Sequence, residues 1–184
     1  MSKYIVEVCA GNITDCINAQ VAGADRIELV SATYLGGLTP SLGLVTKALE
    51  KVDIPIIAMV RPRGGGFNYN QDEIDLIFLD AKLLLEAGVA GIVFGFLNED
   101  LTVDVKNTKK MVDLCKSYNK EAVYHKAFDI TPDLDETTKI LIDLGVDRIL
   151  TSGGMSNVDS GLEKMKELNE KYGNQIEFLA GGGV

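Results

Sequence analysis

Two arginines flank a proline ahead of a glycine run in the segment Val60-Arg61-Pro62-Arg63-Gly64-Gly65-Gly66. Guanidinium groups bind carboxylates and phosphates through paired hydrogen bonds, and the proline holds Arg61 and Arg63 in a fixed relation. Glycines let backbone N–H groups approach an anion closely. The segment therefore predicts a site for a small anion. The alternative is structural, with Arg61 paired to Glu7 and Glu28.

The single histidine of the chain, His125, stands in the segment His125-Lys126-Ala127-Phe128-Asp129. Its ordinary pKa of about 6.5 suits a general acid or base, and Asp129 could orient the imidazole. Lys126 adds a positive charge for ligand binding. A hydrogen-bonded core histidine is the alternative, and one histidine cannot form a zinc site of several histidines.

Two carboxylates, Glu7 and Glu28, fall in neighbouring apolar runs and are candidates for catalysis. Close like charges raise the pKa of one carboxyl, so the pair could share a proton or bind a cation. The alternative is simple ion pairing with Arg26 and Arg61.

Glycine-rich turns follow the last two apolar runs of the chain. Ser152 and Gly153 offer a hydroxyl and a close backbone, and Gly181 and Gly182 offer backbone donors. Such turns bind phosphate groups in barrel proteins, so we predict that all four residues contribute to substrate binding.

The three cysteines form no C-x-x-C pair, and the odd number suits free thiols in a reducing compartment. Cys16 and Cys115 fall on predicted helices as small buried residues. Cys9 ends the first apolar run on the same face as Glu7, where a thiolate could bind Cu(I) or act as a nucleophile.

Seven short apolar runs rich in β-branched residues predict strands, with six helices between them. The runs are residues 4–9, 26–30, 54–60, 91–96, 122–127, 148–151 and 176–180. Alternation of strand and helix predicts a parallel sheet, and charged residues within the strands favour a TIM-like (β/α) barrel. We expect residues 1–184 to be one domain that lacks its last helices and an eighth strand, because a closed barrel has eight strands.

Helix boundaries are marked by local signals. Asn70 and Glu73 have the spacing of a capping box, and Thr39-Pro40 resembles a helix start. A weak repeat places a glycine where a helix ends and a strand begins, at Gly23, Gly88 and Gly145.

The charge balance opposes broad binding to nucleic acid or an anionic membrane. Eighteen Lys and Arg against 27 Asp and Glu give a net charge of -9 and a pI near 4.6. No secretory signal or transmembrane run is evident, so a cytoplasmic protein is expected.

Seven segments, in order, resemble the CutC family of copper homeostasis proteins. They are EVC (7–9), GADRIEL (23–29), GGLTPS (36–41), RPRGG (61–65), HKAFD (125–129), LTSG (150–153) and GGG (181–183). The resemblance implies a cytoplasmic TIM-like barrel, usually oligomeric, that handles copper and binds Cu(I).

The resemblance also implies thiol ligands for Cu(I) near the ends of the first two strands. Cys9 matches the first thiol, but Val30 stands at the second, so another donor is needed, such as Met59 or a partner subunit. Lys126 replaces the family's usual arginine, which keeps the charge and loses the planar fork.

Three functions remain open at this point, the third being a catalytically silent binding or assembly module with an exposed seventh strand as its interface. The first is copper homeostasis with Cu(I) on Cys9. The second is a barrel enzyme for a small anionic or phosphorylated metabolite, with Arg61 and Arg63 on the anion, His125 moving a proton, and a carboxylate accepting charge.

Overall fold

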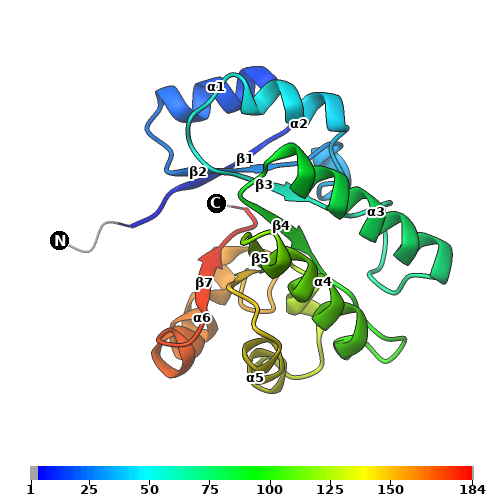
Figure 1. The fold of residues 1–184 in the computed structure, drawn as a ribbon. Helices are drawn as coiled ribbons and strands as arrows, with labels where there is room; N and C mark the ends of the chain where they lie inside the picture. The colour runs from blue at the N-terminus through cyan, green and yellow to red at the C-terminus, as the bar shows by residue number, and fades with distance from the viewer. Residues whose placement is uncertain (1–3, 184) are drawn as a thin grey trace. The chain divides into compact units, whose positions relative to one another are not determined.

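Strands and helices alternate throughout the computed structural model, which describes residues 4–183 (Figure 1). The strands are β1 (Glu7–Ala10), β2 (Arg26–Leu29), β3 (Ile56–Met59), β4 (Gly91–Phe94), β5 (Glu121–Tyr124), β6 (Arg148–Thr151) and β7 (Glu177–Ala180). The helices are α1 (Ile13–Val21), α2 (Leu42–Leu49), α3 (Gln71–Ala87), α4 (Val105–Ser117), α5 (Leu134–Leu144) and α6 (Val158–Tyr172). Over the described residues, the predicted seven strands, six helices and TIM-like α/β order are confirmed.

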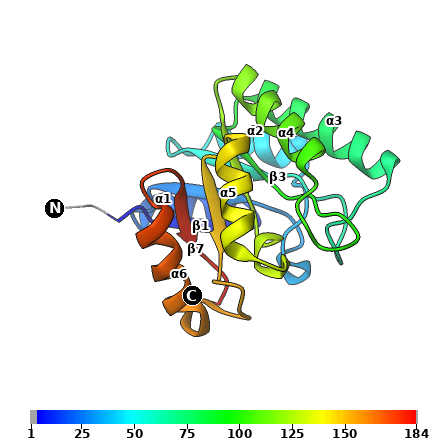
Figure 2. The ribbon, with the colours of Figure 1, turned by 90° about the horizontal axis from the view of Figure 1, so that it is seen from below.

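The described residues form two compact units. The first comprises residues 4–66, 70–93 and 118–120, and its strands β1 to β4 pair in parallel in chain order. The second comprises residues 67–69, 94–117 and 121–183, and its strands β5, β6 and β7 also pair in parallel. Figure 2 shows α6 beside β7 in the second unit.

Burial explains why the apolar runs form strands. Every residue of β2, β3 and β4 is buried, as expected for parallel strands covered on both faces. Several runs continue beyond the strand: Val60 and Phe96 are buried although β3 and β4 have already ended. The predicted strands are therefore correct in place and mostly one to three residues too long.

The helix boundaries agree with most of the local signals. Asn70 and Glu73 form the predicted capping box at the start of α3. Gly88 and Gly145 end α3 and α5 in the left-handed conformation, which a residue without a Cβ adopts readily. Gly23 also has a positive φ, but it lies one residue beyond the Ala22 cap of α1.

The predicted start of α2 at Thr39 is wrong. Ser41 caps the helix, because its side chain accepts a hydrogen bond from the Leu44 N–H. The Thr39 hydroxyl instead contacts the main chain of Arg61, donating to its carbonyl at 3.1 Å. Thr39 therefore joins the loops after β2 and β3.

The repeated Gly-x-Asp-Arg-Ile motif ties strands together at their amino ends. In the first copy, the Asp25 carboxylate accepts a hydrogen bond from the Val6 N–H at 2.9 Å. Arg26, the first residue of β2, forms an ion pair with Glu7, the first residue of β1, and both side chains are only 8% exposed.

The second copy repeats this arrangement in the second unit. The Asp147 carboxylate accepts a hydrogen bond from the Ala122 N–H at 2.8 Å. Arg148, the first residue of β6, lies 2.7 Å from the carboxylates of both Glu121 and Glu177, the first residues of β5 and β7. The repeated motif thus stabilises the sheet by linking neighbouring strands at their amino ends.

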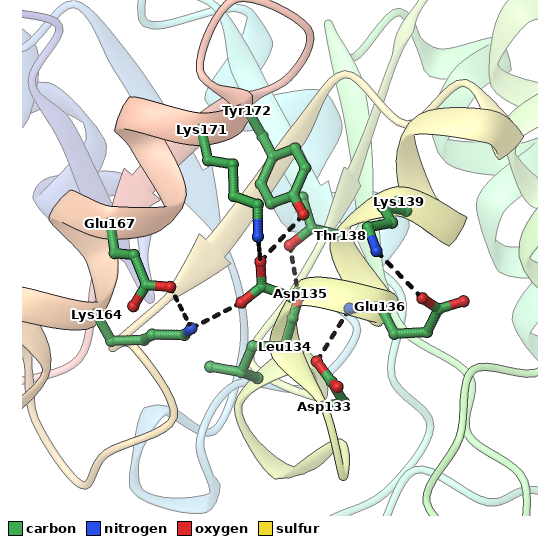
Figure 3. Close-up of polar contacts among 10 residues, drawn as sticks. All are labelled: Asp133, Leu134, Asp135, Glu136, Thr138, Lys139, Lys164, Glu167, Lys171 and Tyr172. Carbon is green, nitrogen blue, oxygen red and sulfur yellow. Dashed lines mark hydrogen bonds and ion pairs between the residues drawn. The ribbon is translucent and has the colours of Figure 1, made fainter.

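A charged cluster joins α5 to α6 (Figure 3). The Asp135 carboxylate of α5 accepts hydrogen bonds from Lys164 at 2.7 Å, from Tyr172 at 3.0 Å, and from Lys171. The two ammonium groups hold the pKa of Asp135 well below its usual range. The cluster fixes the two helices against each other and occupies all four side chains.

Candidate functional site

Cys9 lies on β1, in register with Glu28 on β2. The Cys9 thiol and the Glu28 carboxyl interact closely enough to shift each other's pKa. Cys9 is exposed, whereas Cys16 and Cys115 are fully buried, as the sequence predicted for the two helical cysteines. Cys9 is therefore the cysteine that a ligand can reach.

The surroundings of Cys9 keep its thiol protonated. Loss of water around the sulfur and the neighbouring Glu28 and Glu7 carboxylates raise the pKa of Cys9 to about 12. Burial and the charge of Glu7 likewise raise the pKa of Glu28 to about 7. Within the described residues, the buried Oε1 atom of Glu28 has no hydrogen-bond partner. Near neutral pH, Cys9 is thus a neutral thiol beside a carboxyl that readily changes its protonation.

Glu7 does not lie where a catalytic residue of a TIM-like fold is expected. It begins β1, so it stands at the amino end of the sheet and pairs with Arg26. Active sites in this fold lie at the carboxyl ends of the strands, while the opposite end serves stability. This position favours the structural alternative, an ion pair with Arg26, and a catalytic role for Glu7 stays a prediction.

Val30 and Met59 lie close together beneath the loop after β2. A Cβ placed on Gly37 would be 3.2 Å from Val30 Cγ1 and 3.4 Å from Met59 Cε. Val30 is 1% exposed and Met59 is 3% exposed. The Met59 thioether is therefore packed into the core.

Arg61 holds two loops together with its guanidinium group. Nη1 donates to the carbonyls of Leu35 at 2.9 Å and Gly37 at 3.2 Å, and Nη2 donates to the Gly65 carbonyl at 2.8 Å. The residue is 6% exposed. These bonds direct three N–H donors to the protein's own backbone, in the loops after β2 and β3. Whether Arg61 also binds an anion stays a prediction.

Arg63 grips a carboxylate of its own chain. Nε lies 2.5 Å from Oε1 of Glu73 and Nη2 lies 3.1 Å from Oε2, while Nη1 donates to the carbonyls of Gly64 and Gly66. Glu73 also belongs to the capping box of α3. The planar fork of Arg63 already holds Glu73, and substrate binding by Arg63 stays a prediction.

His125 directly follows β5 and is 3% exposed. Its ring centre lies 4.7 Å from that of Phe67, and Nδ1 accepts a hydrogen bond from the Ala127 N–H at 3.1 Å. That bond assigns the proton of a neutral imidazole to Nε2. Gly95 makes room for the ring: a Cβ there would be 2.5 Å from His125 Cε1 and 2.6 Å from Nδ1.

Asp129 does not orient His125, contrary to the prediction. Its carboxylate accepts hydrogen bonds from the Thr151 hydroxyl at 2.5 Å, from the Ser152 N–H at 3.0 Å and from the Gly154 N–H at 2.9 Å. These donors satisfy a buried carboxylate that has turned toward the loop after β6. Asp129 therefore fixes that loop, and a catalytic role for Asp129 stays a prediction.

Lys126 lies over the glycine loop that follows β7. Its Nζ is so close to Gly182 that any side chain at that position would collide with it. The Gly182 carbonyl accepts from the Val158 N–H at the start of α6, and the Gly181 N–H donates to the Thr151 carbonyl, both at 3.0 Å. Lys126 also lies 3.7 Å from Asp129, and its side chain is 35% exposed.

Ser152 and Gly153 belong to the same region of the second unit. Ser152 is fully buried, and its hydroxyl lies within hydrogen-bond distance of Asp129 and of the Met155 carbonyl. Gly153 lies against the Gly161 carbonyl of α6, which leaves no space for a side chain. The structure brings these two residues together with Lys126 and Gly182, and gives both a role in packing the loop.

The sequence interpretation missed Gly95 and Phe67, which enclose His125. Gly95 lies within the apolar run 91–96, and a glycine inside such a run indicates that another group approaches closely. That signal could have identified Gly95. Phe67 carries no comparable signal, because its contact with the imidazole depends on the path of the loop.

Two absences hold for the part of the chain that the structure describes. Among residues 4–183, no three His, Cys, Asp or Glu side chains lie together in an arrangement that could hold a metal ion. Likewise, none of the described helices combines the length and apolar character needed to span a bilayer.

The chain matches one protein family over nearly its whole length. The sequence model of the CutC family matches residues 4–184. A CutC family protein of Treponema denticola is 40% identical over 184 residues, which are 100% of this chain and 74% of the relative. One from Vibrio cholerae is 41% identical over 182 residues, which are 99% of this chain and 72% of the relative.

A solved structure agrees with the sequence match. The crystal structure provisionally described as the copper homeostasis protein CutC from Streptococcus agalactiae is 32% identical, with a TM-score of 0.90. The similarity covers 98% of this chain and 89% of that one, so the fold described above is that of the relative. The chain therefore belongs to the CutC family.

Proposed function

We propose that this chain takes part in copper homeostasis in the cytoplasm by accepting Cu(I) on the thiol of Cys9. The observation that carries the proposal is the exposure of Cys9 on β1, in a chain whose other two cysteines are fully buried. A soft sulfur ligand selects Cu(I) over harder cations.

One protein thiol does not complete the coordination of Cu(I). Val30 offers no donor atom, and the thioether of Met59 is packed against Gly37. The second ligand is therefore a low-molecular-weight thiol that arrives with the metal.

Transfer of the metal is a ligand exchange without a redox step. A bis-thiolate Cu(I) complex meets Cys9, a copper–sulfur bond to Cys9 forms, and the bond to one small thiolate breaks. The proton of the Cys9 thiol leaves with the departing small thiol, and copper remains Cu(I). Because the pKa of Cys9 is raised to about 12, the free protein presents a protonated thiol, and only exchange with incoming metal removes the proton.

Copper retention against a chelator tests this proposal. Reduced protein is loaded with Cu(I) in the presence of a small thiol and challenged with a chelator of moderate affinity. We expect the parent to retain about one equivalent and Cys9→Ser to release it, since only the thiolate is a strong Cu(I) ligand. Cys16→Ala is the matched control, because that cysteine is buried and should leave retention unchanged.

Equal retention by the parent and by Cys9→Ser would remove Cys9 as the copper ligand. If Cys16→Ala lost Cu(I) to the chelator while its circular dichroism stayed unchanged, the copper ligand would be a buried thiol rather than Cys9.

A further inference from the structure

The Glu28 carboxylate lacks a hydrogen-bond donor beside the cysteine that we propose as the copper ligand. Cys9 on β1 and Glu28 on β2 are paired residues of neighbouring parallel strands, and such strands lie about 4.8 Å apart. Glu28 is 8% exposed, and its buried Oε1 atom has no hydrogen-bond partner within the described residues. A buried carboxylate oxygen of this kind requires a donor, and here a ligand can supply it.

The negative charge of Glu28 is also unbalanced. The charged side chain that shifts the pKa of Glu28 is that of Glu7, which is negative as well. Arg26 precedes Glu28 on β2, but its guanidinium group forms an ion pair with Glu7. The group that would satisfy Glu28 is therefore a hydrogen-bond donor that carries a positive charge.

A copper complex on Cys9 would make this imbalance larger. Cu(I) carries one positive charge and each thiolate carries one negative charge, so a complex with two thiolates is an anion. On Cys9 that anion lies beside the buried Glu28 carboxylate, where like charges repel more strongly than in water. A second thiol that brings its own positive charge removes the repulsion and supplies the missing donor.

We propose that the small thiol that completes the coordination of Cu(I) on Cys9 is an aminothiol, whose protonated amine binds the Glu28 carboxylate. This inference rests on the proposed function and names the class of thiol that it requires. The sulfur of the aminothiol ligates the metal, and its ammonium group donates a charge-assisted hydrogen bond to Glu28. Glu28 thereby selects aminothiols over neutral and acidic thiols.

Cu(I) binding in three small thiols tests the proposal. Cysteamine, mercaptoethanol and 3-mercaptopropionate have similar short chains that end in an ammonium group, a hydroxyl and a carboxylate. The reduced full chain is loaded with Cu(I) in each thiol at pH 8, above the pKa of Glu28 of about 7, and its apparent Kd for Cu(I) is measured against a chelator. The parent should bind Cu(I) most tightly with cysteamine and least tightly with 3-mercaptopropionate.

The variant Glu28→Gln separates the contact with the amine from the different copper chemistry of the thiols in solution. For each protein, the Kd in mercaptoethanol is divided by the Kd in cysteamine. This ratio should be about tenfold higher for the parent than for Glu28→Gln, because glutamine lacks the charge that binds the ammonium group. Glu50→Gln is the matched control: Glu50 lies at the exposed end of α2 and pairs with Lys47, so the ratio should equal that of the parent.

The retained thiol gives a second readout, which does not depend on the chelator. The parent is loaded with Cu(I) in an equal mixture of cysteamine and mercaptoethanol, desalted and weighed by native mass spectrometry. The copper-loaded protein should carry about one small thiol for each copper, and that thiol should be cysteamine. Glu28→Gln should carry both thiols.

Equal ratios of Kd in the parent and in Glu28→Gln would overturn the proposal, and so would retention of mercaptoethanol by the parent. Failure of the proposed function gives a different result, in which Cys9→Ser binds Cu(I) as tightly as the parent in every thiol. If Cys9→Ser loses Cu(I) in all three thiols while the ratios stay equal, only the selection of an aminothiol by Glu28 is wrong.

Discussion

Replacing Gly95 with alanine should destabilise the protein through steric clashes with two residues, His125 and Ala127. The added Cβ would lie 2.5 Å from His125 Cε1, 2.6 Å from His125 Nδ1 and 2.9 Å from Ala127 Cβ. His125 cannot simply move outward, because it is 3% exposed, packs on Phe67 and is bonded to the Ala127 N–H. The ring must therefore shift against its packing.

The expected magnitude follows from two opposing effects. Overpacking a core site destabilises by about 1–3 kcal/mol, while removing a glycine from the unfolded chain stabilises by about 0.4–1 kcal/mol. The net loss in the free energy of unfolding for Gly95→Ala should be about 1–2 kcal/mol. For a chain of this size, that loss lowers the Tm by roughly 2–8 °C.

A double-mutant cycle separates this contact from other effects. Urea unfolding is followed by circular dichroism and tyrosine fluorescence, since the chain has six tyrosines and no tryptophan. His125→Ala alone should destabilise by roughly 2–4 kcal/mol through the lost ring. Gly95→Ala should then cost less in the His125→Ala background, where only the clash with Ala127 Cβ remains, so the double variant loses at least about 1 kcal/mol less than the sum.

Gly66→Ala is the matched control, because a Cβ at Gly66 would meet nothing within 4 Å. The reasoning is refuted if Gly95→Ala is as stable as the parent. It is also refuted if Gly95→Ala loses the same free energy with and without the imidazole of His125.

Three further predictions concern charged groups. Burial raises the pKa of Glu28 from 4.5 to about 7, so the free energy of unfolding should fall as pH rises between those values. Urea titrations should show a smaller fall for Glu28→Gln. At pH 8 this variant should be about 1–3 kcal/mol more stable than the parent. Arg148→Met should lower the free energy of unfolding by about 1–3 kcal/mol, because Glu121 and Glu177 lose their shared cation. Equal Tm values for Arg148→Met and the parent would contradict this prediction. Asp135→Asn should lower the free energy of unfolding by about 1 kcal/mol at neutral pH. The difference in stability between variant and parent should vanish in acid, because the ion pairs stabilise only the ionised form of Asp135 and acid protonates it.

The elements of the fold follow from the sequence because burial dictates their residue types. Fully buried parallel strands must be apolar throughout, so the runs at β2, β3 and β4 were visible without any contact information. Their ends were not, because Val60 and Phe96 are as buried as the strands that they follow. An apolar run reports burial and does not report where strand pairing stops.

The partners of the candidate site residues were harder to predict than their positions. Asp129 lies four residues from His125, which suggested a contact, but its carboxylate binds Thr151, Ser152 and Gly154, 22 to 25 residues away. Short separation in a loop does not fix the direction of a side chain. The chain path after a strand decides it, and sequence spacing does not contain that path.

The Asp-Arg motifs stabilise the sheet from the amino ends of the strands, away from the loops that carry the candidate functional residues. The first joins β1 to β2 through Arg26, and the second joins β5, β6 and β7 through Arg148. The ion pairs of Arg26 and Arg148 lie at the amino ends of the strands, whereas Cys9 and His125 lie toward the carboxyl ends. The side chains that bind a ligand can therefore change in evolution while the Arg26 and Arg148 ion pairs keep the strands aligned.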